Sequence, residues 1–285
     1  MPYSKNNRIY FFLFPAFVFL GLFALLPMAQ IFYYSFFENN LITENIFVGF
    51  DNYTELISDA NFWQVLLNSF IYLAVTPVLI IISLTLAIAV REETRFNRFF
   101  RTVYFLPVIT PLVIAGIIWR WIFAEDTGLL NYLLSVTGIE NVKWLSASPQ
   151  NMFSVMILTV WRGFGYYLLI FLAGLALVSK ELEEAAELDG ATKFQRSWYI
   201  LLPQLKPSII LVFVISSASA LKIFTELYIM IPGSPMSNKT LVYYLFTEAF
   251  ERFNFGYSSA AGVVLFVITL AFSYANVKLT AGKTD

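Results

Sequence analysis

Residues 180–207 read KELEEAAELDGATKFQRSWYILLPQLKP and separate two long apolar blocks of a 285-residue chain. Nine residues from Lys180 to Lys206 are charged, although only 13% of the whole chain is. Small and apolar residues recur among the glutamates at helical spacing, and glycine at position 190 is a typical helix stop. The stretch therefore predicts a short helix that ends at Gly190, and a second helical turn at 191–199.

The composition places the rest of the chain in a lipid bilayer. The sequence is 59% hydrophobic and has a mean hydropathy of +0.71, whereas soluble domains are roughly 45–50% apolar and about 25% charged. Cysteine and histidine are absent, which excludes disulfides, thiolate chemistry and histidine acid–base catalysis. A net charge of −1 gives no basic field for nucleic acid.

Six stretches are long and apolar enough to cross about 30 Å of hydrocarbon, which takes roughly 20 residues. Three are uncharged throughout, and the other three carry Arg120, Arg162, or Lys222 with Glu226. Prolines at 107, 111, 203 and 207 mark entries or kinks of these stretches. We expect an all-α polytopic membrane protein of one domain, residues 1–285, with six transmembrane helices at 10–37, 64–90, 102–124, 153–179, 207–229 and 253–277. The first stretch is too long for a cleaved signal core of roughly 7–15 residues.

The distribution of lysine and arginine predicts the orientation of the spans, because cytoplasmic loops carry an excess of both. The termini and the connections on their side of the membrane carry twelve basic residues: Lys5, Arg8, Arg91, Arg95, Arg98, Arg101, Lys180, Lys193, Arg196, Lys206, Lys278 and Lys283. The connections on the opposite side carry three: Lys143, Lys239 and Arg252. Both termini and the 180–206 loop are thus expected in the cytoplasm.

The charged loop has two interpretations from its periodicity alone: a solvated linker, or a helix that offers acids and small residues to a cytoplasmic partner. The motifs favour the second. EAAELDGA at 184–191 followed by ILLP at 200–203 resembles the EAA loop of ATP-binding-cassette importer permeases. The likeness continues in the segments VGFDNYTELISDANFWQVLLNSF (48–70), FFRTVYFLPVITPLVIAGIIWRWIF (99–123), WRGFGYYLLIFLAGL (161–175) and TLVYYLFTEAFERFNFGYSSAAGVVLF (240–266), which resemble the first permease of carbohydrate importers of the maltose and glycerol-phosphate type.

The resemblance implies a coupling helix between the fourth and fifth spans that docks into a cytoplasmic ATPase subunit. The residues expected to carry this contact are Glu184, Ala185, Ala186, Asp189, Gly190 and Pro203. It also implies a second permease, two ATPase subunits that bind ATP and Mg²⁺, and an external sugar-binding protein. This chain would bind no cofactor or metal, would not be an enzyme by itself, and would lie in a bacterial or archaeal cell membrane.

Charges within spans are costly and usually face a cavity or a partner. Lys222 and Glu226 are four residues apart and are expected to pair on one helix face, either at a helix interface or beside a transport path. Gly163 and Gly165 are expected to leave room near two tyrosines, whose faces suit sugar rings. From the resemblance, together with this pair, the expected path residues are Gly163, Tyr166, Tyr167, Ser216, Ser219, Ala220, Lys222, Ile223 and Glu226.

Two features bear on the alternatives. The tail Ala281-Gly-Lys-Thr-Asp285 ends in part of a phosphate-binding loop, but Val277 stands where that motif needs its first glycine, so ATP must be bound elsewhere. An ion-driven secondary transporter would need buried carboxylates within its spans, and only Glu226 qualifies. A scaffold protein would need no polar residues along a cavity. The sequence therefore predicts a permease subunit of an ATP-driven sugar importer, with a secondary transporter as the alternative.

Overall fold

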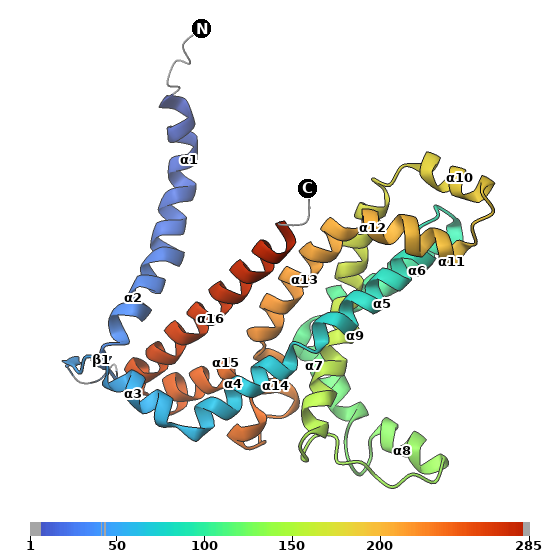
Figure 1. Cartoon of the computed structure of the whole chain (residues 1–285). Helices are drawn as coiled ribbons and strands as arrows, with labels where there is room; N and C mark the ends of the chain where they lie inside the picture. The colour runs from blue at the N-terminus through green and yellow to red at the C-terminus, as the bar shows by residue number, and fades with distance from the viewer. Residues whose placement is uncertain (1–6, 41, 43, 282–285) are drawn as a thin grey trace. The chain divides into compact units, whose positions relative to one another are not determined.

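The computed structural model describes residues 7–40, 42 and 44–281, and these are mostly helical (Figure 1). One short antiparallel pair is described, in which Phe37 lies opposite Phe47 and Glu38 opposite Ile46. The elements are α1 (Asn7–Leu20), α2 (Leu26–Tyr34), β1 (Phe37–Glu38), β2 (Ile46–Phe47), α3 (Asp51–Ser58), α4 (Ala60–Tyr72), α5 (Val75–Ala89), α6 (Arg95–Ile109), α7 (Leu112–Ile122), α8 (Leu129–Val136), α9 (Gln150–Leu175), α10 (Lys180–Leu188), α11 (Lys193–Arg196), α12 (Leu202–Gln204), α13 (Lys206–Leu221), α14 (Thr225–Met230), α15 (Leu241–Phe246) and α16 (Phe255–Ala281). Short π-helical turns connect some of them at η1 (Gly21–Leu25), η2 (Ser197–Leu201) and η4 (Thr247–Glu251), and a 3₁₀ turn lies at η3 (Met236–Asn238).

Among the described residues, four helical stretches are long and apolar enough to cross a membrane: Phe12–Tyr34, Ala60–Ala89, Gln150–Leu175 and Phe255–Asn276. They correspond to the expected first, second, fourth and sixth spans. Two bent helix pairs would raise the number to six, if each pair is one span.

Two bent helix pairs lie at the expected spans 102–124 and 207–229, where the prolines were expected to mark entries or kinks. The pair Arg95–Ile109 and Leu112–Ile122 bends by 95°, and the pair Lys193–Gln204 and Lys206–Leu221 by 68°. Both bends fall next to a predicted proline, Pro111 or Pro207, because proline has no N–H to continue the helical ladder. The fifth stretch also stops at Leu221 and resumes only at Thr225.

The described residues form two compact units. The first holds the residues up to Trp63 together with Tyr244–Ile268. The second, which we call the coupling unit, holds Gln64–Tyr243 together with the residues from Thr269 onward. Each unit is described by itself.

The core of the coupling unit lies where α5, α6 and α13 pack against α9 (Figure 1). Ser83 on α5 donates a hydrogen bond of 2.9 Å to the carbonyl of Phe164 on α9. Gly165 permits the closest approach, because a Cβ at this position would collide with the backbone carbonyl of Tyr104 on α6. These contacts fix the helices from which the charged loop projects.

Candidate functional site

The charged loop folds as the sequence predicts, into a short helix that ends at a glycine. Helix α10 is capped by Gly190, whose φ of 82° lies in the left-handed region that favours glycine. The N–H of Gly190 donates to the carbonyl of Glu187 at 3.0 Å, and that of Ala191 to the carbonyl of Ala186 at 2.9 Å. This pair of bonds is a Schellman motif, which satisfies carbonyls that a helix end leaves open. The second turn starts two residues later than expected, at Lys193, where Thr192 and Gln195 form a capping box.

Two ion pairs hold α10 to neighbouring elements of the coupling unit. Glu183 Oε2 lies 2.5 Å from Arg91 Nη2, just after α5, and Glu187 Oε2 lies 2.7 Å from Arg196 Nη1 on α11. The turn that carries Arg91 is itself fixed, because Arg101 donates hydrogen bonds to the carbonyls of Val90 and Arg91. Helix α10 is therefore attached to its neighbours by side-chain contacts as well as by the covalent backbone.

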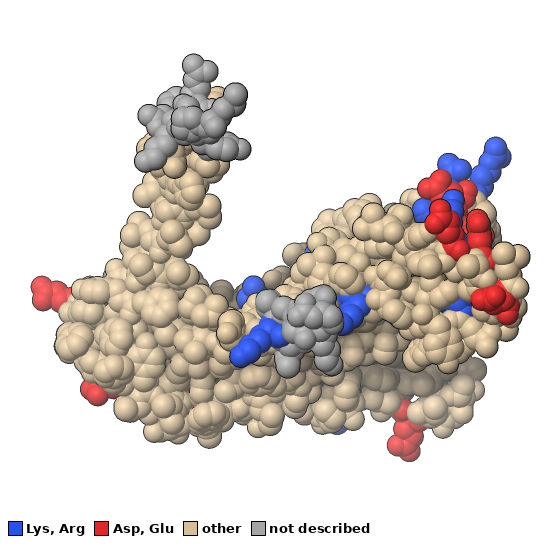
Figure 2. All heavy atoms as spheres, turned by 45° about the horizontal axis from the view of Figure 1, so that its top comes forward, with Lys and Arg blue, Asp and Glu red and all other residues tan. Residues whose placement is uncertain are grey.

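A cleft of about 1020 Å³ separates α10 and α11 from the ends of α5 and α9. Charged side chains gather at this end of the coupling unit (Figure 2). The lining combines both signs of charge with apolar residues, namely Ile88, Ala89, Arg91, Glu92, Glu93, Arg101, Leu172, Leu175, Ala176, Val178, Lys180, Glu183, Glu184, Glu187, Lys193, Arg196, Ser197 and Leu201.

Most of the predicted coupling residues are exposed to solvent, although Glu184 also lines the cleft. Glu184, Ala185, Asp189, Gly190 and Pro203 are exposed, whereas Ala186 is half-buried. An added Cβ at Gly190 would meet no described atom within 4 Å. The two alanines therefore differ in their exposure to solvent and do not present one exposed surface.

Sequence reasoning missed an apolar residue on the same surface. Leu188 has 90% of its surface exposed, and Leu182 has 47%. A single exposed apolar residue is common on protein surfaces, but Leu188 adjoins the residues that were expected to contact a partner subunit. The available signal was the position of Leu188, four residues after Glu184 on the same helix face.

Inside the apolar helices, the predicted pairing of Lys222 with Glu226 is wrong. The helix breaks between Leu221 and Thr225, so the two residues do not share a helix face. Glu226 instead lies 3.9 Å from Arg162 on α9, while Lys222 is exposed. A residue 64 positions away in sequence supplies the neutralising charge.

The glycines of α9 do not open the room that the sequence suggested. A Cβ at Gly163 would meet the side chain of Leu79 at 3.1 Å, and Gly165 is closed by α6. Tyr166 is exposed, Tyr167 is buried, and their rings meet edge-on with centroids 5.3 Å apart. These glycines serve helix packing.

The remaining predicted path residues lie on or just after α13. Ser216, Ala220 and Ile223 are buried, whereas Ser219 is exposed. Each serine hydroxyl donates a hydrogen bond to a backbone carbonyl of its own helix: Ser216 to that of Val212 at 2.7 Å, and Ser219 to that of Ile215 at 2.9 Å.

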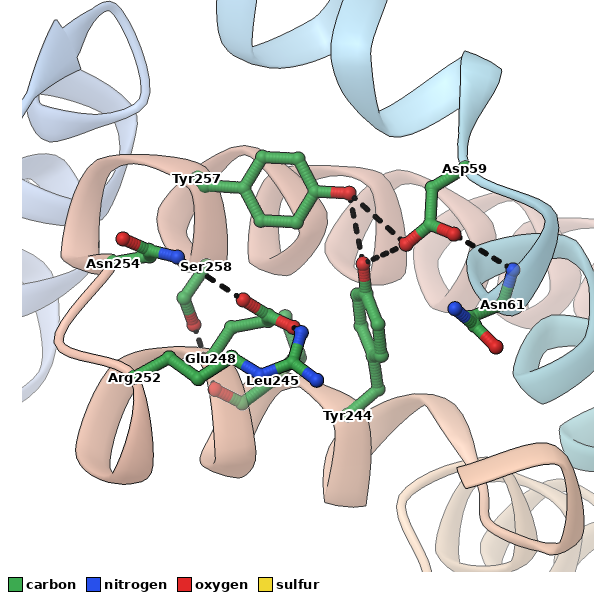
Figure 3. Close-up of polar contacts among 9 residues, drawn as sticks. All are labelled: Asp59, Asn61, Tyr244, Leu245, Glu248, Arg252, Asn254, Tyr257 and Ser258. Atoms are coloured by element: carbon green, nitrogen blue, oxygen red, sulfur yellow. Dashed lines mark hydrogen bonds and ion pairs between the residues drawn. The ribbon is translucent and has the colours of Figure 1, made fainter. Parts of the chain in front are cut away.

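The first unit contains a polar site that the sequence did not suggest (Figure 3). Tyr244 donates to Asp59 at 2.6 Å and shares a hydrogen bond of 2.8 Å with Tyr257. Nearby, buried Glu248 pairs with Arg252 at 2.6 Å and accepts from Asn254 at 3.3 Å. Burial and the adjacent carboxylate of Asp59 raise the pKa of the Tyr244 phenol. These groups border a cavity of about 460 Å³.

No group of three or more carboxylates among the described residues is arranged to hold a metal ion. The partial phosphate-loop motif at the C-terminus falls on residues 282–285, outside the described range.

Comparison with known proteins identifies the family. A family model described as "Binding-protein-dependent transport system inner membrane component" matches residues 80–279. The chain is 34% identical over 291 residues to the probable ABC transporter permease protein YurN of Bacillus subtilis (strain 168), with 99% of both chains covered. It is 35% identical over 283 residues to the arabinooligosaccharides transport system permease protein AraP of the same strain, a match that covers 98% of this chain and 90% of AraP.

The fold agrees with that assignment. A chain in the crystal structure of a bacterial ABC transporter involved in the import of the acidic polysaccharide alginate superposes with a TM-score of 0.87 at 20% identity. The match covers 99% of this chain and 97% of the other. The protein therefore belongs to the family of inner-membrane components of binding-protein-dependent transport systems.

Proposed function

We propose that this chain is one of two permease subunits of an ATP-driven importer, and that its substrate is a sugar or an oligosaccharide. Relatives at 29–35% identity are named for arabinooligosaccharides, for trehalose and maltose, and for diacetylchitobiose. An external binding protein would deliver the sugar, as in the alginate transporter solved with its periplasmic protein. Partner subunits would bind and hydrolyse ATP with Mg²⁺, and this chain would make and break no bond.

The proposed arrangement has one domain with six crossings, in which each bent helix pair counts as one crossing. Both termini and α10 would then face the cytoplasm, because this side carries most of the lysines and arginines. An ion-driven secondary transporter is disfavoured, because the chain belongs to a binding-protein-dependent family. The acid that such a mechanism would use, Glu226, also lies beside Arg162.

The observation that carries the coupling proposal is the open surface of α10. Ala185 and Leu188 are exposed on a helix that two ion pairs hold to Arg91 and Arg196. Such a helix can transmit force without unfolding. We infer that α10 docks into a cleft of the ATPase subunit, with Leu188 as an apolar anchor and the acids facing basic residues.

The path for the sugar is proposed between α9, α13 and α14. Tyr166 presents an exposed aromatic face, the ring of Tyr167 meets it edge-on, and Ser219 is exposed on α13. Arg162 with Glu226 gives this apolar region one charged pair that can bind sugar hydroxyls. Replacement of Tyr166 by alanine is expected to change the rate or range of uptake while assembly is retained.

The experiment compares two substitutions with the same local chemistry. Gly190→Asp places a carboxylate on the open end of α10, where we expect loss of ATPase-subunit binding and of ATP-driven uptake in proteoliposomes. Gly138→Asp is the matched control, because Gly138 also has positive φ (80°) and no described atom within 4 Å of an added Cβ. Both variants should insert equally. Normal binding and uptake in Gly190→Asp would refute the coupling role of α10.

A further inference from the structure

The first two turns of α6 present exposed arginines and phenylalanines side by side. The helix starts at Arg95, and the hydroxyl of Thr94 caps it by accepting from the N–H of Asn97 at 3.1 Å. Phe96 and Phe99 have 69% and 63% of their surfaces exposed. Arg95 and Arg98 are exposed too, and within the described part of the chain neither has an ion-pair partner.

The apolar side of this surface is continuous with the rest of α6. Five exposed residues follow one another three or four positions apart and therefore lie on one helix face: Phe96, Phe99, Val103, Leu106 and Ile109. In an inner-membrane protein, a stripe of this kind on an apolar helix is covered by lipid or by another helix. The first two residues of this apolar stripe, Phe96 and Phe99, directly follow Arg95 and Arg98 in the sequence.

The charge on this surface is of one sign because the neighbouring groups are directed elsewhere. Glu92 and Glu93 line the cleft beside α10, whereas Arg95 and Arg98 do not. Arg101 is occupied by the carbonyls of Val90 and Arg91. Two free guanidinium groups therefore flank the apolar stripe where α6 begins.

A similar sequence at the start of α11 makes different contacts. Thr192-Lys-Phe-Gln-Arg196 repeats the residue types of Thr94-Arg-Phe-Asn-Arg98, including the threonine cap. There, however, Arg196 is bound by Glu187 at 2.7 Å. Only the copy on α6 keeps both cations free for an external anion.

We propose that the start of α6 binds anionic phospholipids, with Arg95 and Arg98 on the headgroup phosphates and Phe96 and Phe99 between the acyl chains. Basic residues that flank an apolar face are the pattern by which interfacial helices bind acidic lipid. The cytoplasmic leaflet as the location of the site rests on the orientation given under the proposed function, whereas lipid binding itself does not. The site would anchor the turn that holds Arg91, and through it α10.

The test measures lipid preference, so it does not depend on transport. The purified permease complex in nanodiscs of phosphatidylcholine is titrated with phosphatidylglycerol, and bound lipid is measured by native mass spectrometry. Each arginine near an anionic surface contributes about fivefold to binding, so R95Q/R98Q should lose about 30-fold in preference for phosphatidylglycerol. R95K/R98K should keep most of the preference because the charges remain. Lys143→Gln, which removes a charge from another loop, should keep all of it.

Four results would overturn the proposal. The first is an unchanged preference in R95Q/R98Q, and the second is a loss in R95K/R98K as large as in the glutamine variant. The third is displacement of the lipid by inorganic phosphate at the same concentration, because the site would then bind the free anion. The fourth is loss of the ATPase subunit in R95Q/R98Q with lipid preference intact, because the surface would then be a protein interface. Failure of uptake in a complex that keeps its lipid preference would count against the proposed function alone.

Discussion

The ion pair between Arg91 and Glu183 gives a quantitative test of how α10 is held. Its side chains are 28% and 16% exposed, and the oxygen–nitrogen distance is 2.5 Å. A charge-assisted hydrogen bond in such a partly buried setting contributes about 1.5–3 kcal/mol. Glu183→Gln keeps the shape and removes the charge, so we expect the ordered position of α10 to lose about 2 kcal/mol relative to an undocked loop. This loss equals roughly 30-fold in the equilibrium.

Two measurements read out that change. Amide hydrogen exchange of residues 180–191 should become faster, and the affinity of the ATPase subunit for the permease should fall by up to roughly 30-fold, because only the ordered fraction binds. The reversed pair R91E/E183R should recover most of the affinity. Glu140→Gln makes the same chemical change in another exposed loop and should alter neither measurement.

The cycle of single and double variants separates the pair from unrelated effects. A coupling energy below about 0.5 kcal/mol would mean that Arg91 and Glu183 act independently. Exchange rates in Glu183→Gln equal to those of the original protein would refute the idea that this pair positions α10.

Three further predictions follow from single positions. Leu188→Ser should weaken ATPase-subunit binding by about 10- to 150-fold, as measured by titration in detergent, because burying a leucine contributes about 1.5–3 kcal/mol; unchanged binding would remove it from the interface. Gly165→Ala should destabilise the protein by about 1–3 kcal/mol in thermal unfolding, because the added Cβ would overlap a carbonyl of α6. Gly21→Ala is the control, because no described atom lies within 4 Å of its added Cβ. Equal melting temperatures of the two variants would contradict the close packing at Gly165. Glu125 accepts hydrogen bonds from Ser146 and from the N–H of the residue before it, and these lower the pKa of its carboxyl below the usual value of 4.5. These hydrogen bonds to the ionised carboxylate should stabilise the folded loop at 137–149 above pH 4.5. The stabilisation should be lost as the pH falls through the lower pKa that Glu125 has in the folded state. Amide hydrogen exchange of this loop should become faster at low pH in the original protein but not in Glu125→Gln. The same dependence of exchange on pH in both proteins would refute the role of Glu125.

The sequence predicted what depends on local chemistry. The lengths of the apolar stretches predicted the four long apolar helices, and glycine at 190 predicted the end of α10, because both signals lie within one segment. Prolines at 111 and 207 indicated kinks, but the angles of 95° and 68° depend on which helices pack beside them. Bend angle is a tertiary property, so it had no signal in the sequence.

The failures share a cause. Lys222 was expected to pair with Glu226 because an intact helix brings positions i and i+4 together, and this helix is broken between them. The true partner, Arg162, lies on another helix. The cluster of Asp59, Tyr244 and Tyr257 likewise joins segments almost 200 positions apart. No periodicity reports such contacts.

In the proposed coupling role, attachment at several points would let α10 move the helices around it instead of bending alone. Its first residue follows α9 by a short connection, Glu183 binds the turn between α5 and α6, and Glu187 binds α11. A load on Leu188 and Gly190 is thus divided among three parts of the coupling unit. A helix held only by its chain ends would take up the same load by local unfolding, since four polar groups at each end lack intrahelical partners. We therefore expect loss of one ion pair to lower uptake per ATP hydrolysed, and loss of both pairs, in E183Q/E187Q, to abolish uptake while ATP hydrolysis continues; full uptake in that double variant would contradict the argument.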